Sequence, residues 1–318
     1  MSVETGSALS GAAAAGSSAR ASGKSIERTA KDYWPFVLPA LIIVSSVILF
    51  PWLFTIWMSL NEWKLGGSIH FAGLSNYAKL FTDERFRDAV WQTIYYTVLA
   101  TGLPLVIGTF AAVIFHEKFP LRGVLRGLYI MPMMATPVAI ALVWVMMFHP
   151  QLGVLNYLLS LVGIPPQLWV FSPKTVIPSL ALIETWQWSP LVMLIVLGGL
   201  ASLPTEPYES AMIDGATRWQ MFHKITLPLI MPFIMVALIL RVIDALKSFD
   251  IIFAITQGGP GNASETLNIY LYNTAFPYRD MGYGSALAVV FFIIVIGLSL
   301  VMLWMRQRNK WDEQGADA

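Results

Sequence analysis

The sequence predicts an all-α protein that crosses a membrane about six times. Of its 318 residues, 56% are hydrophobic and only 12% are charged, and the mean hydropathy is +0.64. A soluble domain carries about 25% charged residues, so this composition excludes a soluble protein. Several apolar stretches reach the length of about 20 residues that a helix needs to span a bilayer. The polar segment Glu206–Pro228 lies between the fourth and the fifth of these stretches and is predicted to be helical.

The net charge is +1 and the chain contains no cysteine. The charge gives no reason to expect nucleic acid as a partner, and the lack of thiols excludes disulfides and thiolate metal sites. The apolar stretches occupy most of the chain, which leaves no room for a separately folded catalytic domain.

The chain begins with a segment, residues 1–32, that is rich in Ser, Ala and Gly and contains scattered Lys and Arg. Such a composition cannot bury a core, so we expect a disordered cytoplasmic tail. The segment is not a cleaved signal peptide, because the apolar stretch that follows it is too long. Residues 33–306 are predicted to form the membrane domain, and residues 307–318 a second cytoplasmic tail.

The predicted spans are residues 36–60, 88–115, 128–149, 175–202, 228–256 and 285–305. Proline interrupts several of them, which spans packed against neighbouring helices tolerate. The segments on the same side of the membrane as the amino terminus hold twelve basic residues: Arg20, Lys24, Arg28, Lys31, Lys118, Arg122, Arg126, Arg218, Lys224, Arg306, Arg308 and Lys310. The loops on the other side hold six: Lys64, Lys79, Arg85, Arg87, Lys174 and Arg279. Because basic residues are enriched in cytoplasmic loops, both termini and the segment Glu206–Pro228 are predicted to be cytoplasmic.

The cytoplasmic segment begins with the signals of a short helix. Thr205 can cap this helix, Pro207 fits its first turn, and Gly215 can end it in a left-handed conformation. Residues three and four apart lie on one side of a helix. One face is therefore predicted to carry Tyr208, Ala211 and Met212.

A second helix is predicted directly after the first. Thr217 and Gln220 have the spacing of a capping box, in which each side chain bonds to the backbone N–H of the other residue. Pro228 lies where the chain returns to the membrane.

One motif in this segment is specific. It consists of Glu209-Ser-Ala211, three residues, Gly215, nine residues, and then Ile225-Thr-Leu227-Pro228. This pattern resembles the EAA loop of ATP-binding-cassette (ABC) importer permeases, which begins Glu-Ala-Ala and has the same spacing. Ser210 is the one departure, and it replaces one small residue by another. A helix lying on lipid headgroups is the alternative, but it does not account for the Gly and Ile-x-Leu-Pro spacing.

The resemblance covers roughly residues 36–305 and implies the fold of a type I importer permease, with a cytoplasmic coupling helix. It implies a bacterial inner membrane location, and as partners a second, related permease, two ATPase subunits, an external solute-binding protein and membrane lipid. ATP and Mg²⁺ are used by the ATPases in that family, so this chain is expected to bind no cofactor or metal and to catalyse no reaction. The residues implied in ATPase coupling are Glu206, Tyr208, Glu209, Ala211, Met212, Asp214 and Gly215.

Charged residues inside the fifth span indicate a second candidate site. Arg241, Asp244, Lys247 and Asp250 alternate in sign at every third position, and each costs about 2.5–3.5 kcal/mol in the middle of a span. Two interpretations remain open: a ladder that neutralises itself and packs the bundle, or the lining of a polar substrate cavity near mid-membrane. Ser248 lies one helical turn beyond Asp244 and can share its face.

The fourth span adds polar and aromatic groups that suit a sugar. Glu184, Gln187 and Ser189 can hydrogen-bond to hydroxyls, and Trp186 and Trp188 can stack on an apolar sugar face. The alternative is that the two Trp rings only pack and that Glu184 pairs with a basic residue such as Arg241.

A Gly-Gly-Pro turn after the fifth span, Gly258–Pro260, resembles the sugar-importer branch of these permeases, although Gly and Pro also mark ordinary loops. The resemblance implies a sugar or sugar-derivative substrate. Its implied contacts are Glu184, Gln187, Trp188, Leu191, Arg241, Asp244, Ala245 and Ser248. The maltose-type permease has largely neutral residues there, so the charges make maltose doubtful. We hypothesise that Arg241 binds an anionic or strongly polar group of the substrate.

Two other classes of protein are considered. An ion-coupled secondary transporter is expected to contain inverted repeats, and no such internal repeat is visible. A membrane-bound enzyme needs a catalytic motif, but the four histidines, His70, His116, His149 and His223, are widely spaced and no nucleophile motif is present.

Overall fold

The computed structural model describes residues 34–315, most of which are helical. The elements are α1 Trp34–Ser59, β1 Asn61–Glu62, β2 His70–Phe71, α2 Ser75–Thr82, α3 Glu84–His116, α4 Arg122–Met134, α5 Pro137–Met147, α6 Val154–Leu161, the 3₁₀-helix η2 Trp169–Phe171, α7 Val176–Leu200, α8 Glu206–Ile213, α9 Arg218–Met221, the π-helix η3 Phe222–Thr226, α10 Leu227–Leu246, α11 Asp250–Thr256, α12 Leu267–Ala275 and α13 Met281–Gly315. The predicted tail of residues 1–32 lies outside the described residues, and α13 continues past the boundary predicted at residue 306.

The described residues divide into two units, residues 34–53 and the residues from 54 onward, here called the 54–318 unit. The first unit contributes the beginning of α1, a helix that contains Pro39 and Pro51. The second unit contains the elements from β1 onward and both sites described below.

Within residues 34–315, five helices are long and apolar enough to cross a membrane, and there are up to six spans if α4 and α5 count as one. The span predicted over residues 128–149 is broken into two helices, because α4 and α5 meet at an angle of 101°. Ala135 and Thr136 between them are extended, with ψ angles of 147° and 142°. Pro137 accounts for the break, because proline disfavours a helical conformation in the residue before it and has no N–H to continue the helix.

The predicted span over residues 228–256 is also corrected. The helix begins earlier, at Arg218, and runs through η3 and α10 to Leu246. A new helix, α11, starts at Asp250 after Phe249, whose φ of −131° and ψ of −53° lie outside the helical range. The four predicted ladder charges are therefore divided between two helices and the turn that joins them.

Helices α3 and α7 pack closely along much of their length. A Cβ atom at Gly108 of α3 would lie 2.6 Å from the carbonyl oxygen of Ser189 and 2.6 Å from the Cβ atom of Val192 on α7. Only glycine allows the two backbones to approach this closely, which is how small residues promote helix packing in membranes. The contact fixes α7, which carries Glu184, against α3.

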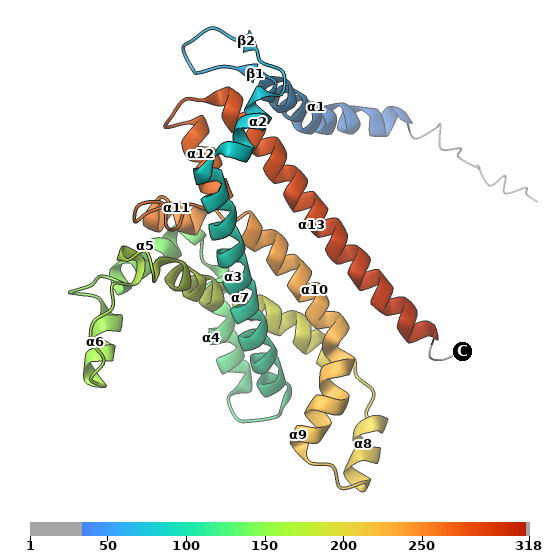
Figure 1. Cartoon of the computed structure of the whole chain (residues 1–318). Coiled ribbons are helices and arrows are strands. Elements are labelled where there is room, and N and C mark those ends of the chain that lie inside the picture. The colour runs from blue at the N-terminus through green and yellow to red at the C-terminus, as the bar shows by residue number, and fades with distance from the viewer. Residues whose placement is uncertain (1–33, 316–318) are drawn as a thin grey trace, which may run out of the picture. The chain divides into compact units, whose positions relative to one another are not determined.

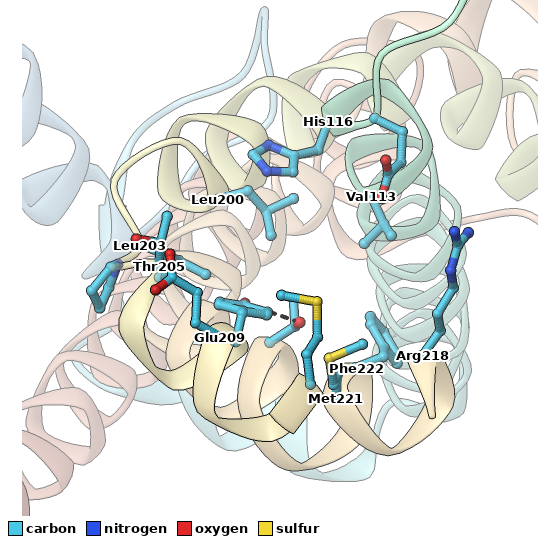
Figure 2. Close-up of a pocket in the computed structure, with 14 residues that line it drawn as sticks. Val113, His116, Leu200, Leu203, Thr205, Glu209, Arg218, Met221 and Phe222 are labelled. Atoms are coloured by element: carbon cyan, nitrogen blue, oxygen red, sulfur yellow. Dashed lines mark hydrogen bonds between the residues drawn. The ribbon is translucent and has the colours of Figure 1, made fainter. Parts of the chain in front are cut away.

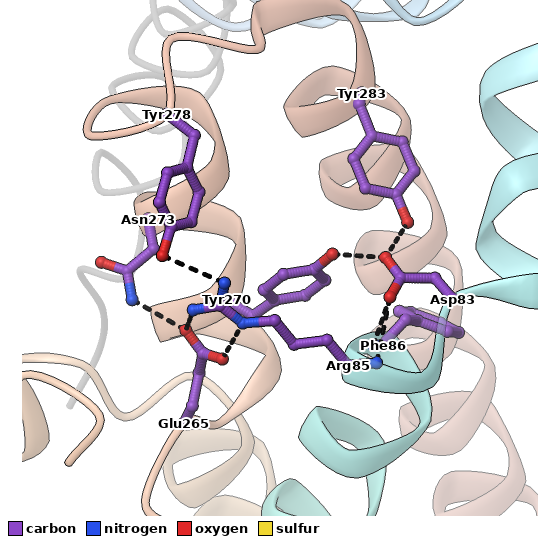
Figure 3. A network of polar contacts seen from close by, with 8 residues as sticks. All are labelled: Asp83, Arg85, Phe86, Glu265, Tyr270, Asn273, Tyr278 and Tyr283. Carbon is purple, nitrogen blue, oxygen red and sulfur yellow. Dashed lines mark hydrogen bonds and ion pairs between the residues drawn. The ribbon is translucent and has the colours of Figure 1, made fainter. Parts of the chain in front are cut away.

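A polar network joins the start of α3 to α12 and α13 (Figure 3). Asp83 caps α3 through the N–H groups of Arg85 and Phe86, and its Oδ2 accepts hydrogen bonds of 2.5 Å from the hydroxyls of Tyr270 and Tyr283. Two guanidinium nitrogens of Arg85 donate to the two carboxylate oxygens of Glu265, at 2.6 and 2.7 Å. These bonds connect segments that are nearly 200 residues apart in sequence.

In the unit of residues 54–318, α8 and α9 lie at one end and β1, β2, α2 and α12 at the other (Figure 1). The cytoplasmic segment predicted from the sequence is thus at the opposite end from the predicted external segments that contain β1, β2, α2 and α12. This arrangement agrees with the order of the spans along the chain.

Candidate functional site

The segment with the EAA-like motif forms two short helices, α8 and α9. Pro207 lies in the first turn of α8, as predicted. The predicted cap by Thr205 is wrong: its φ of −86° and ψ of −25° are helical, and its side chain makes no capping hydrogen bond. A capping residue needs an extended backbone so that its hydroxyl can reach the first N–H groups of the helix. Gly215 has a φ of +76°, which confirms that a left-handed residue ends the helix.

The predicted capping box before α9 is present. The Gln220 N–H donates to Thr217 Oγ1 at 3.3 Å, and the Thr217 N–H donates to Gln220 Oε1 at 2.8 Å. The helix then widens into η3, whose last residue, Thr226, precedes Leu227 and Pro228 in the first turn of α10. Elements α9, η3 and α10 are therefore one continuous helical rod.

The two sides of α8 differ in exposure. Tyr208 and Ala211 are half-buried, whereas Met212 of the same predicted face is 59% exposed. The other predicted coupling residues are exposed: Glu206, Glu209, Asp214 and Gly215. Ile213 is 87% exposed and was not predicted. Met212 and Ile213 are adjacent exposed apolar residues in a polar segment, and their adjacency was visible in the sequence.

A cavity of about 590 Å³ lies behind the two short helices (Figure 2). Its walls come from α8 and α9 on one side and from the ends of α3 and α7 on the other. The lining residues labelled in Figure 2 are Val113, His116, Leu200, Leu203, Thr205, Glu209, Arg218, Met221 and Phe222. The short helices are thus not packed tightly against the spans.

A second cavity, of about 300 Å³, lies between α7 and the α10–α11 break. Six of the eight residues predicted to contact substrate line it: Glu184, Gln187, Trp188, Arg241, Asp244 and Ser248. Ala245 instead is 2% exposed and packs in an apolar cluster with Ile251 and Ile252. One residue is about 100° of rotation on a helix, which turns Ala245 away from the face of Asp244. Leu191 is half-buried and does not line this cavity.

An ion pair is buried at the cavity wall. The Arg241 Nη2 lies 2.8 Å from the Glu184 Oε2, and the two side chains are 1% and 5% exposed. The same nitrogen donates to the carbonyl oxygen of Ala100 at 3.2 Å, and the guanidinium carbon lies 5.0 Å from the Trp188 ring centre. Glu184 thus pairs with Arg241, as one of the two interpretations predicted, while both residues also line the cavity.

Tyr96 of α3 completes this polar cluster and was not predicted. Its hydroxyl donates to the Glu184 Oε1 at 2.9 Å and lies 2.9 Å from the Ser248 Oγ. Tyr96 lies between Tyr95 and Thr97 in the sequence, so no pattern distinguished it. Among the residues that line this cavity, three buried side-chain atoms have no hydrogen-bond partner in the described part of the chain: Arg241 Nε, Arg241 Nη1 and Gln187 Oε1. Buried polar atoms are rarely left unpaired, which indicates that they can receive a ligand or water.

Lys247, another charge of the predicted ladder, also lines this cavity. Lys247 and Asp244 form a loose pair at 4.0 Å, with both side chains about half exposed. Asp250 lines the cavity from α11. Trp186 lies outside this cavity and packs edge-on against Trp144, with ring centres 5.7 Å apart. In the described part of the chain, no group of three His, Asp or Glu residues could hold a metal ion.

Known proteins resemble this chain over most of its length. The family model for "Binding-protein-dependent transport system inner membrane component" matches residues 105–309. The trehalose/maltose transport system permease protein MalF of Thermococcus litoralis is 34% identical over 277 residues, which cover 87% of this chain and 94% of the relative. The sulfoquinovosyl glycerol transport system permease protein SmoG of Agrobacterium fabrum is 34% identical over 268 residues, 83% of this chain and 87% of the relative.

A solved structure shares the fold. It is that of a bacterial alginate ABC transporter in complex with alginate pentasaccharide-bound periplasmic protein, in which one chain matches with a TM-score of 0.74 and 24% identity. The match covers 88% of this chain and 96% of that chain. The residues matched by the family model include the EAA-like motif and every predicted cavity residue.

Proposed function

Because the chain belongs to the family of binding-protein-dependent transport system inner membrane components, we propose that it is the permease subunit of an ATP-driven bacterial importer for a sugar or a sugar derivative. The relatives named for trehalose and maltose and for sulfoquinovosyl glycerol support this substrate class. The partners proposed are a second, related permease, two ATPase subunits and an external solute-binding protein. This chain hydrolyses no ATP and holds no cofactor itself, and both of its termini are cytoplasmic.

The exposed helix α8 is the observation that carries the coupling role. Its outer side presents Glu206 and Ile213 to a partner, and the left-handed Gly215 lets the chain reverse directly after it. We propose that this side docks on an ATPase subunit, with Ile213 as an apolar anchor within a polar rim. The location of α8 at the end of the 54–318 unit opposite β1, β2, α2 and α12, which belong to loops predicted to be external, supports this proposal (Figure 1).

The coupling loop lies between the two helices that carry the second cavity. Helix α7, with Glu184, Gln187 and Trp188, ends just before the loop, and α10, with Arg241 and Asp244, begins just after it. Closure of the ATPases on ATP moves α8, and these rods transmit the motion to the cavity. Alternating access of this kind needs two states of the bundle whose populations a ligand can shift.

The unpaired groups at the second cavity support a sugar with free hydroxyls. Arg241 offers two N–H nitrogens without acceptors, and Gln187 offers an oxygen without a donor. A hydroxyl both donates and accepts, whereas an anionic group only accepts. Glu184 also compensates the charge of Arg241 at 2.8 Å. We therefore favour a neutral sugar over the anionic substrate hypothesised from the sequence.

Copurification tests the proposed function. Chain extracted from its native membrane in detergent should bring along an ATPase, and substrate-loaded binding protein should raise the ATPase activity. Gly215→Pro should abolish this stimulation, because proline is held at a φ of about −65° and cannot adopt the +76° found here. Gly163→Pro is a matched control, since Gly163 has a similar φ of +74° but lies after α6.

Two outcomes contradict the proposal. One is uptake that continues without any ATPase and follows an ion gradient, which is the behaviour of a secondary transporter. The other is equal loss of stimulation in both glycine variants, which points to general destabilisation instead of coupling.

A further inference from the structure

The coupling helix α8 has one side-chain hydrogen bond to another element within the described residues. The Tyr208 hydroxyl donates to the Thr226 Oγ1 at 3.0 Å, and both residues are half-buried. Tyr208 thus points inward, toward the chain's own helices, while Glu206 and Ile213 of α8 are exposed. This direction does not suit the ATPase contact that the sequence resemblance implies for Tyr208.

The acceptor, Thr226, lies at the junction between η3 and α10. Thr226 is the last residue of the π-helix η3, directly before α10. Such wide turns are rare and occur frequently at functional sites. From Thr226, α10 runs 15 residues to Arg241, which is about 22 Å at the rise of an α-helix. The bond therefore connects α8 to the rod that carries one wall of the second cavity.

Packing alone does not fix the angle of α8. The cavity of about 590 Å³ separates α8 and α9 from the ends of α3 and α7 (Figure 2). Because this space is open, the two short helices can move toward the spans without displacing packed side chains. Under these conditions a single directional bond has a large influence on the position of α8.

We propose that Tyr208 is a positioning residue whose hydroxyl fixes α8 to the start of α10, so that movement of α8 reaches the second cavity. The proposal rests on the importer function above and adds to it a residue role that differs from ATPase docking. When the bond is absent, α8 still engages the ATPase but moves α10 less. ATP is then hydrolysed with less transport.

The test compares variants in the complete importer reconstituted in vesicles. The readout is substrate imported per ATP hydrolysed, with the thermal stability of each complex measured in parallel. Tyr208→Phe and Thr226→Val each remove one half of the bond and should lower this ratio by about fivefold, the size of effect expected for one hydrogen bond. The double variant should be no worse than either single variant, because all three lose the same bond.

Two matched controls use neighbouring threonines. Thr226→Ser keeps the accepting hydroxyl and should retain the wild-type ratio. Thr205→Val changes a threonine of the same loop whose side chain makes no capping bond, and it should also retain the ratio.

Three results overturn the inference. A wild-type ratio in Tyr208→Phe shows that the bond has no role in coupling. Loss of the ATPase subunits from Tyr208→Phe shows that Tyr208 is a docking contact. A wild-type chain that binds no ATPase refutes the importer function itself, and with it this inference.

Discussion

At the scale of single residues, the pair of Arg241 and Glu184 decides the chemistry of the second cavity. Two opposite charges are removed from solvent at 2.8 Å, which is favourable only because further hydrogen bonds satisfy them. Tyr96 and Ser248 supply these bonds on the side of Glu184, and Ala100 supplies one on the side of Arg241. The pair therefore carries no net charge, while Arg241 Nε and Nη1 have no acceptor among the described residues.

Changing Glu184 to Gln tests this account. Glutamine keeps the shape and can still accept from Tyr96, but it leaves the charge of Arg241 uncompensated. We expect uptake to shift from a neutral sugar toward its carboxylated derivative by about tenfold, equivalent to about 1.4 kcal/mol. The measurement is competitive uptake of the two sugars by the reconstituted importer.

Asp244→Asn is the control, because this carboxylate is about half exposed at the cavity and should change the preference less. If the wild-type chain already prefers the anionic sugar and loses that preference on Arg241→Gln, the original hypothesis of anion recognition is correct.

At the scale of elements, the contact between α3 and α7 depends on Gly108. Any side chain there meets backbone and Cβ atoms of α7, not the flexible end of a side chain. We expect Gly108→Ala to lower the free energy of unfolding by about 1–3 kcal/mol, because the helices must separate to admit the methyl group. Thermal unfolding in detergent measures this loss.

Gly102 provides a control on the same helix. A Cβ at Gly102 meets nothing within 4 Å. Gly102→Ala should therefore leave stability unchanged or raise it by up to about 1 kcal/mol, since alanine favours a helix more than glycine does. Equal effects of the two substitutions would show that helix propensity, and not the contact with α7, governs both positions.

At the scale of the molecule, α3 links two ends of the 54–318 unit. Its 33 residues extend about 50 Å, from the Asp83 network at one end to the wall of the larger cavity at the other. Partial burial raises the pKa of Asp83, but the hydrogen bonds from Tyr270, Tyr283 and two backbone N–H groups outweigh it, and the pKa is lowered. Burial and the bond to Asp83 raise the pKa of Tyr270.

The lowered pKa of Asp83 predicts that the network around it contributes less stability in acid. A carboxyl group with a depressed pKa in the folded state stabilises the fold above its unfolded pKa, and the contribution disappears as the pH falls through the folded value. We expect Asp83→Asn to cost about 1 kcal/mol at pH 7, a modest value because the group is only half-buried. The difference from wild type should shrink as the pH falls below about 4, near the unfolded pKa.

Thermal unfolding in detergent between pH 3 and pH 7 measures this difference. Asp88→Asn is the control, because Asp88 is exposed and lies five residues further along the chain. A difference between Asp83→Asn and wild type that stays constant over this range contradicts the account.

The sequence by itself determined the features that depend on neighbouring residues. Apolar length predicted most of the spans, since a bilayer needs a fixed run of apolar residues. The positive φ of Gly215 and the capping box of Thr217 and Gln220 followed from local backbone chemistry. The spacing of the EAA-like motif indicated the family.

Only the tertiary structure decided how distant segments meet. Hydropathy does not distinguish a straight span from two helices that meet at 101°, nor a single helix from α10 and α11. Tyr96 and Glu184 are 88 positions apart, and Tyr208 faces Thr226 across a turn, so no local pattern reveals either bond. Hydrogen bonds and ion pairs act over a few ångströms in space, and folding alone brings these partners within that distance.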